Sequence, residues 1–365
     1  MNSFGNSIKI TFFGESHGDY VGIVIDGLSS GIPIDQTMID YELTKRRPKS
    51  IYSTARAELD QYQILSGLYN GVTTGAALTF IIPNNNTKSE DYQELAAIPR
   101  PSHSDYTAHV KYQGYNDPRG GGMFSGRITV LFMIIGAIAK QILNQKGIEV
   151  ASHILRIHNL VDKPFDSLNI DLEVAKDLQN LDFPLLDQSV EIPMREKILK
   201  AKNKKDSVGG IVETAIINLP AGIGEPLFSS IESQLAALLF SVPAVKGVEF
   251  GLGFEISKHY GSEVNDGYQI DASGKISTLS NNSGGISGGI SNGMPIIIKT
   301  AIKPTPSIGK KQASVNLETH ENVELEIKGR HDPAIVNRVV HVINAVIYYG
   351  ILDLLVTSHQ TDWMR

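Results

Sequence analysis

Several short segments of this 365-residue chain place polar or cationic side chains beside glycine or proline, where they could do chemistry. They are Gly14–Gly18 (GESHG), Arg100–Asp105 (RPSHSD), Arg119–Arg127 (RGGGMFSGR), Lys303–Ser307 (KPTPS) and Arg330–Pro333 (RHDP). Arginine binds phosphate and carboxylate groups through paired N–H donors. Glycine-rich backbone can approach a phosphate or a flat ring closely, and histidine can donate a proton near neutral pH. Together these segments indicate an enzyme that handles a multiply anionic, phosphorylated ligand.

Each feature alone also has a simpler explanation. Arg46, in the basic run Lys45–Arg47, could be a solvated helix end. His17 could only satisfy a turn, and Gly120–Gly122 could be a flexible connector. Asp332 could cap the helix expected after it. Residue types by themselves leave these alternatives open.

The elements that must position these segments follow from hydrophobic periodicity and from turn residues. Ile8–Phe13 is β-rich and leads into the GESHG segment. Helices are expected over Gln36–Arg47, with Asp35 as N-cap, and over Ser125–Lys146, directly after the glycine segment. A last helix, Val336–Leu355, follows the RHDP segment. The other expected strands are 21–25, 63–67, 72–74, 77–82, 211–218, 248–257 and 295–302, and the other expected helices are 185–202 and 231–240.

Composition excludes several classes of protein. The 33 Lys+Arg against 39 Asp+Glu give a net charge of −6, so a general nucleic-acid partner is not expected. There are no cysteines, which excludes thiolate chemistry and fits a cytoplasmic protein, and the ten histidines show no metal-ligand spacing. The most apolar stretch, Ile128–Ala139, is shorter than the ~18 residues of a membrane span and predicts a core helix.

Familiar fingerprints of other enzyme classes are missing, and nothing divides the chain. No GxxxxGK[ST], HExxH or GxSxG motif occurs, and the glycine pair at Gly251 lacks the third glycine of a dinucleotide fingerprint. No low-complexity linker interrupts the sequence, so we expect a single domain over residues 1–365.

Three longer stretches resemble the signatures of the chorismate synthase family. They are Gly14–Gly31, Arg119–Leu143 and Gly329–Arg338. Four shorter segments lie between them in the order typical of the family: RPSHSDY, VPAVKGVEFG, SGGISGGISNG and KPTPS. The resemblance therefore spans residues 4–355. It implies an α+β fold, a β-α-β sandwich with helices packed between antiparallel sheets, assembled as a homotetramer in the cytoplasm.

The implied reaction is the shikimate-pathway conversion of 5-enolpyruvylshikimate 3-phosphate to chorismate and phosphate. This anti-1,4-elimination needs reduced FMN but has no net redox change. NADPH is a possible flavin reductant, and an external flavin reductase is the expected partner. A flavin oxidoreductase with net electron transfer, and an FMN-storing relative without catalysis, are the competing hypotheses.

The resemblance also implies roles for individual residues. His17 would protonate the departing phosphate, and His103 would protonate the reduced flavin. Ser16 and Ser125 would support these proton transfers, and Asp332 would help the flavin accept the ring proton.

Binding residues are implied in the same way. The substrate's phosphate and carboxylates would be held by four arginines: Arg46, Arg100, Arg127 and Arg330. NADP(H) is linked to the position of Arg46. Flavin contacts are implied at Met123, Phe124, Ser125, Pro243, Ala244, Gly288, Lys303, Pro304, Thr305, Pro306, Ser307 and Arg330. The chain departs from the family where Met123-Phe124 replaces Arg-Ser, where Pro243 replaces Asn, and where Ile51 stands near the place of a second arginine.

Overall fold

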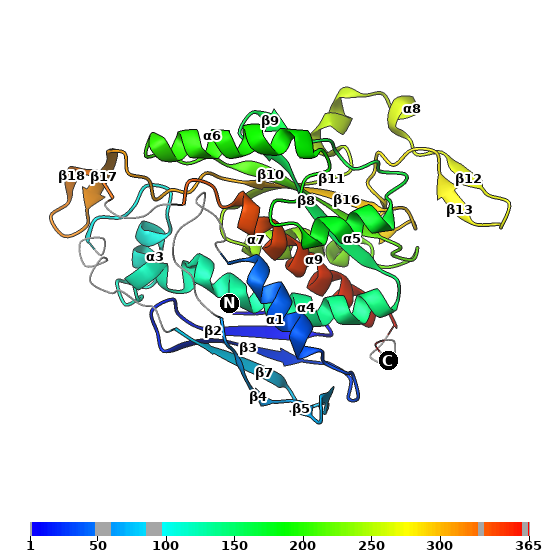
Figure 1. Cartoon of the computed structure of the whole chain (residues 1–365), viewed down its shortest axis with the longest axis horizontal. Helices are drawn as coiled ribbons and strands as arrows, with labels where there is room; N and C mark the ends of the chain where they lie inside the picture. Colours follow the sequence, from blue (N-terminus) through cyan, green and yellow to red (C-terminus); the bar gives the residue numbers. More distant parts are fainter. Residues whose placement is uncertain (1, 48–59, 85–96, 328–331, 360–363, 365) are drawn as a thin grey trace.

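Two five-stranded sheets enclose a layer of helices (Figure 1). The structure is a computed structural model and describes residues 2–47, 60–84, 97–327, 332–359 and 364. The first sheet has the order β1 (Ser3–Phe4), β2 (Lys9–Gly14), β3 (Tyr20–Asp26), β7 (Leu78–Pro83), β4 (Gln63–Ser66). The second has the order β11 (Val245–Phe250), β16 (Ile296–Ile302), β10 (Gly210–Ile217), β8 (Glu149–Ile157), β9 (Leu160–Val161).

All strand pairs within both sheets are antiparallel among the described residues. The helices of the inner layer are α1 (Gln36–Lys45), α4 (Thr129–Gln145), α7 (Ile231–Ser241) and α9 (Val336–His359). Helix α9 packs against α4 and α7 and against β8 and β10, while α4 also contacts β3 of the other sheet. The expected α+β sandwich, with helices between antiparallel sheets, is confirmed.

The remaining elements lie around this body. The other helices are α3 (Asp105–Lys111), α5 (Leu172–Asn180), α6 (Glu191–Asn203) and α8 (Gly261–Val264), with 3₁₀ turns at Arg119–Phe124, Gly126–Ile128, Gln188–Val190, Leu227–Ser229 and Gly253–Lys258. Two-stranded hairpins pair β5 (Leu68–Tyr69) with β6 (Val72–Thr73), β12 (Tyr268–Ile270) with β13 (Ile276–Thr278), β14 (Ile286–Ser287) with β15 (Ile290–Ser291), and β17 (Gln312–Asn316) with β18 (Glu321–Leu325). Hairpins β12–β13 and β17–β18 project at opposite ends of the molecule (Figure 1).

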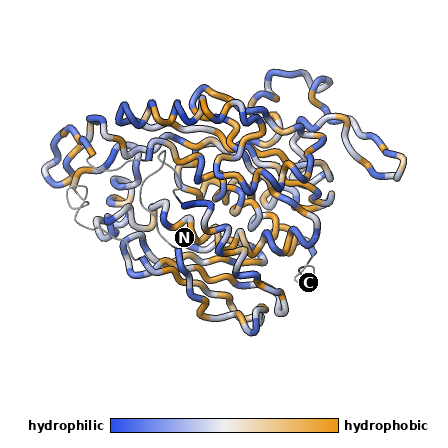
Figure 2. Tube along the Cα trace, viewed as in Figure 1, coloured by the Kyte–Doolittle hydropathy of each residue, from blue (hydrophilic) through white to orange (hydrophobic). Residues whose placement is uncertain are grey.

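The main hydrophobic core runs through both sheets and the helices between them, and a smaller cluster lies between α5 and the second sheet. Hydrophobic residues concentrate in this central layer, and hydrophilic ones lie mainly at the periphery (Figure 2). The segments Gly126–Gln145 and Val336–His359 are long and apolar enough to cross a membrane, but 83% and 94% of their apolar windows are buried inside the protein. The single domain over residues 1–365 stays a prediction, which this continuous core supports.

The last helix holds the first strands in place. The carboxylate of Asp353 accepts hydrogen bonds from the backbone N–H groups of Asn6, Ser7 and Ile8 at 2.8–2.9 Å. The Tyr349 hydroxyl donates to the Ile8 carbonyl at 2.8 Å. Strand β2, which leads to the GESHG segment, therefore depends on contacts made more than 340 residues later in the chain.

Two of the expected elements are wrong in part. The helix expected over 185–202 begins only at Glu191, because Asp187 first accepts from the Ser189 N–H and opens a 3₁₀ turn. The strand expected over 248–257 ends at Phe250, because Gly251 and Gly253 take positive φ and a 3₁₀ turn follows.

Candidate active site

The two histidines of the sequence motifs lie against one glycine-rich turn. Residues 120–122 all take positive φ, a conformation that glycine adopts without penalty. A Cβ atom on Gly120 would lie 2.1 Å from Cε1 of His17, and one on Gly121 would lie 3.4 Å from Cε1 of His103. The Ser16 N–H donates to the carbonyl of Gly122 at 3.2 Å. The glycine segment is therefore a surface on which both imidazoles pack.

Replacing Gly120 with alanine should displace His17 and slow turnover at least ~100-fold, the lower range for losing a positioned acid. Alanine also meets left-handed backbone strain of roughly 1–2 kcal/mol. Gly274→Ala is the matched control, because Gly274 has a φ of +84° and nothing within 4 Å of an added Cβ. Equal turnover in the two variants, normalised to folded protein, would contradict this placement of His17.

His103 and Arg100 share one carboxylate. Asp105, the first residue of α3, accepts from Nε and Nη2 of Arg100 at 2.7 and 2.8 Å, and its Oδ1 lies 2.6 Å from Nδ1 of His103. Burial raises the pKa of Asp105, but the hydrogen bonds from Arg100 and His103 outweigh it and hold the pKa below its ordinary value. With Nδ1 engaged, Nε2 is the atom of His103 that can exchange a proton.

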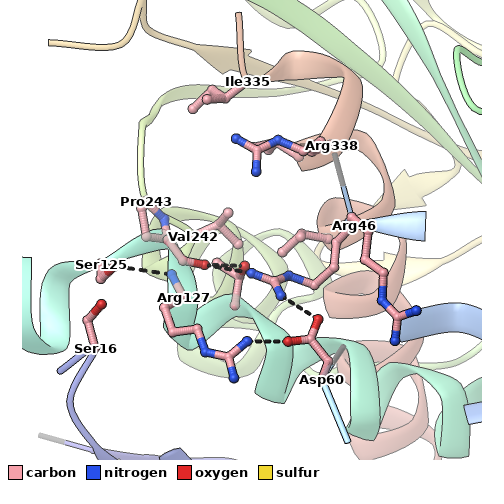
Figure 3. A pocket seen from close by; sticks show the side chains of 14 residues that line it. Ser16, Arg46, Asp60, Ser125, Arg127, Val242, Pro243, Ile335 and Arg338 are labelled. Atoms are coloured by element: carbon pink, nitrogen blue, oxygen red, sulfur yellow. Dashed lines mark hydrogen bonds and ion pairs between the residues drawn. The ribbon is translucent and has the colours of Figure 1, made fainter. Parts of the chain in front are cut away.

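A cavity of about 230 Å³ gathers arginines from three parts of the chain (Figure 3). Arg46 and Arg47 come from the end of α1, Arg127 from the turn before α4, and Arg338 from α9. The cavity is also lined by Ser16, Asp60, Ser125, Gly126, Thr129, Val242, Pro243, Ile335, Val339 and Val342. Because the Arg46 side chain is only 13% exposed and is ion-paired, the solvated-helix-end interpretation is wrong.

Asp332 and Arg338 form an ion pair between the RHDP segment and α9. Nη2 of Arg338 donates to Oδ2 of Asp332, while Oδ1 of Asp332 is buried and has no hydrogen-bond partner among the described residues. Burial lowers the pKa of Arg338 to about 10, and the positive charge of Arg46 adds to the effect. Asp332 thus carries one anchored and one unengaged oxygen, and it makes no described bond to a backbone N–H of α9.

The expected cofactor segments meet beside these groups. The Lys303 N–H donates to the carbonyl of Ala244 at 2.9 Å, and Lys303 Nζ donates to the carbonyl of Ser102 at 2.5 Å. Nη1 of Arg100 donates to the Ser307 hydroxyl at 3.3 Å. The loop Lys303–Ser307 therefore lies against the loop that carries His103.

A second cavity, of about 490 Å³, adjoins the first, and the two share Ser125, Thr129 and Pro243 in their linings. Four of the expected flavin contacts line this second cavity: Met123, Phe124, Ser125 and Pro243. Aromatic side chains of β2 and α4 complete the wall, with Phe12 and Phe132 packed edge to face at 4.8 Å.

Not every expected residue joins this cluster. Gly288 lies in the β14–β15 hairpin, next to Gly289, whose carbonyl accepts from the N–H of Ile231 at the start of α7. Pro243 follows the other end of that 11-residue helix, about 16 Å away along the axis. Arg100 does not line the arginine cavity. Arg330 and Ile51 lie outside the described residues.

Comparisons with known proteins agree with this geometry. A family model described as "Chorismate synthase" matches residues 8–356. The chain belongs to the chorismate synthase family. It is 45% identical to the chorismate synthase of Methanocaldococcus jannaschii, with 98% of this chain and 96% of that protein covered. It is 44% identical to the enzyme of Methanosarcina barkeri, over 98% and 96%.

A solved structure supports the same assignment. A "Crystal Structure of Chorismate Synthase" superposes with a TM-score of 0.77 at 25% sequence identity, covering 97% of this chain and 93% of that one. Chorismate synthases are carbon–oxygen lyases of the shikimate pathway, which supplies aromatic amino acids, and they act on a small-molecule substrate.

Sequence reasoning about the chorismate synthase signatures missed three residues of the cavity. Arg338 stands at the end of the third signature, six positions after Asp332, and that motif could have indicated it. Arg47 belongs to the basic run that drew attention to Arg46. Asp60 lies in no motif that was singled out, so only the tertiary structure places it between two arginines.

Proposed function

We propose that this chain eliminates phosphate from 5-enolpyruvylshikimate 3-phosphate to give chorismate, with reduced FMN as cofactor and no net redox change. The C–O bond to phosphate breaks, a ring proton leaves, and the electron pair of the C–H bond enters the new diene. The observation that carries this proposal is the gathering of four arginines around one cavity that also reaches Ser16 and Ser125. A protein with a net charge of −6 must focus positive potential locally to attract a multiply anionic substrate.

The described residues fit a bound flavin. Thr305 Oγ1 is buried without a hydrogen-bond partner in the described structure, at the centre of the expected cofactor loop. Lys303 adds a cation whose pKa is lowered by burial and by nearby Lys246. Met123, Phe124 and Pro243 offer apolar surface in the adjoining cavity. When bound, reduced FMN supplies electron density to the substrate ring as the bond to phosphate breaks.

The chain's own residues would bind the anions and move protons. Arg46 and Arg127 would hold the substrate's anionic groups, joined by Arg100 and Arg330 from their loops. His17, buried against Gly120, would give its proton to the departing phosphate. His103 would exchange a proton at Nε2, with Asp105 fixing the ring through Nδ1. Asp332 would accept a proton at its unengaged Oδ1.

An anaerobic assay with photoreduced FMN tests this proposal. Phosphate and chorismate should appear together while the flavin stays reduced. Stoichiometric flavin oxidation would support a flavin oxidoreductase instead, and flavin binding without product would support a storage protein. Four arginines on one cavity favour the elimination over either alternative, because neither alternative needs them.

Replacing Arg46 with alanine should raise the KM for the substrate about 10- to 100-fold, since one charge-assisted hydrogen bond contributes ~1.5–3 kcal/mol. Steady-state kinetics with reduced FMN measure the change. Lys197→Ala is a suitable control, because Lys197 lies on α6 away from the arginine cavity. A KM within a factor of two of the wild-type value would remove Arg46 from the binding site.

The wider setting is also a proposal. The enzyme would work in the cytoplasm as a homotetramer, with an external flavin reductase and NADPH as the ultimate reductant. Membership of the chorismate synthase family supports both the assembly and the outside reductant.

A further inference from the structure

We infer that Asp60 is a positioning residue that sets Arg46 and Arg127 as a pair for the substrate's anionic group. The inference rests on the proposed role of these two arginines. Oδ2 of Asp60 accepts from Nη1 of Arg46 at 2.8 Å, and its Oδ1 accepts from Nη1 of Arg127. The Asp60 side chain is fully buried, at the floor of the arginine cavity (Figure 3).

The two arginines come from separate elements, so something must fix their spacing. Arg46 caps the end of α1, and Arg127 lies in the 3₁₀ turn that precedes α4. Nη2 of Arg46 donates to the Gly126 carbonyl only at 3.4 Å, whereas Nε of Arg127 donates to Oδ1 of Asn84 at 3.1 Å. Among the contacts of the described residues, the carboxylate of Asp60 bridges the two guanidinium groups directly.

Asp60 also offsets the positive charge of the arginine cavity. Among the described residues that line the cavity, Asp60 is the sole carboxylate, and it pairs with two of the four lining arginines. Guanidinium groups crowded in a partly buried site repel one another, and burial with the charge of Arg46 already lowers the pKa of Arg338. A carboxylate shared by two guanidinium groups offsets this repulsion and holds the two groups side by side.

The backbone at Asp60 suggests which substitutions fit. Its φ is +49°, a left-handed conformation that asparagine and glycine tolerate better than alanine. Asp60→Asn removes the charge and turns an N–H donor toward one of the two arginines. Asp60→Gly removes the carboxylate and leaves space for a small carboxylate from solution.

The test measures KM, kcat and the affinity for inorganic phosphate, the last by calorimetry on the protein without flavin. Asp60→Asn should raise the KM at least 10-fold with a smaller change in kcat, and should weaken phosphate binding by a similar factor. Millimolar formate should lower the KM of Asp60→Gly. In the wild type formate would only compete with the substrate and raise the KM, so this rescue distinguishes positioning from general stabilisation.

Glu42→Gln is the matched control. Glu42 is also a buried carboxylate on α1 between two cations, with Lys45 Nζ at 2.7 Å and Lys140 Nζ at 2.8 Å, but it does not line the cavity. Its loss should lower thermal stability and leave KM and phosphate affinity unchanged.

Several results would overturn the inference. Unchanged phosphate binding in Asp60→Asn would show that Asp60 does not position the two arginines. Tighter binding would show that the carboxylate only opposes anions. Failure of both Asp60 variants to fold, with or without formate, would show that the carboxylate serves the fold alone. If Arg46→Ala also leaves phosphate affinity and KM unchanged, the proposed role of the arginines fails. If Arg46→Ala weakens phosphate binding and raises the KM while Asp60→Asn leaves both unchanged, the inference about Asp60 fails but the proposed role of the arginines stands.

Discussion

Replacing His17 with alanine should slow phosphate release about 100- to 10,000-fold, the usual contribution of a positioned general acid. His17 is buried at 6% exposure against Gly120. It lies near Asp117, whose pKa is lowered mainly by the hydrogen bond from Arg119 and to a smaller extent by the charge of His17. If His17 is the acid, its replacement should also remove the limb of the pH–rate profile that reports the acid.

The His17 experiment needs a histidine outside the site for comparison. His109→Ala is suitable, because His109 is exposed on α3. FMN binding and thermal stability should stay near the wild-type values in both variants. Turnover within a few-fold of wild type for His17→Ala, on folded and flavin-loaded protein, would show that the phosphate leaves without help from this residue.

Changing Asp332 to asparagine should slow turnover at least ~100-fold while substrate and FMN still bind. The amide oxygen of asparagine can accept the hydrogen bond from Arg338, but the side chain cannot take up a proton. The substitution is nearly isosteric, so the cavity keeps its shape. Anaerobic turnover, FMN binding and thermal unfolding on one preparation measure all three effects.

The loss of a buried charge could by itself lower stability, since Arg338 would keep no anionic partner there. Asp353→Asn provides the comparison. Asp353 is a buried carboxylate of α9, but it accepts hydrogen bonds from the backbone of residues 6–8, away from the arginine cavity. If Asp332→Asn is stable and turns over as fast as Asp353→Asn, Asp332 serves structure alone.

Local signals predicted part of the fold well. Helix α1 begins at Gln36 with Asp35 as its N-cap, whose Oδ1 accepts from the N–H groups of Thr37 and Met38. Strand β8 was not predicted, because burial along both faces leaves no alternation and places polar residues inside. Its His153 is fully buried between the carboxylates of Asp162 and Glu213, at 2.9 and 3.0 Å. Only the tertiary structure supplies such partners.

The candidate site shows the same limit. The motifs indicated His17, His103 and Arg46 because glycine, proline and charge cluster around them in the sequence. They could not indicate that the imidazoles of His17 and His103 pack against Gly120 and Gly121, since those contacts join residues roughly 20 to 100 positions apart. Asp60 has no such local signal, and its role depends wholly on two side chains brought to it by other elements.

The hydrogen bonds between Asp353 of α9 and residues 6–8 have a consequence for synthesis on the ribosome. Residues 6–8 find their backbone partner only when Asp353 has left the exit tunnel, and Arg338 and Asp332 become available at nearly the same time. Contacts between such distant segments form slowly, because a long loop must close before they stabilise anything. Strands β1, β2 and β3 can pair with one another early, but residues 6–8 are fixed to α9 only after the segment that carries Asp353 has been synthesised.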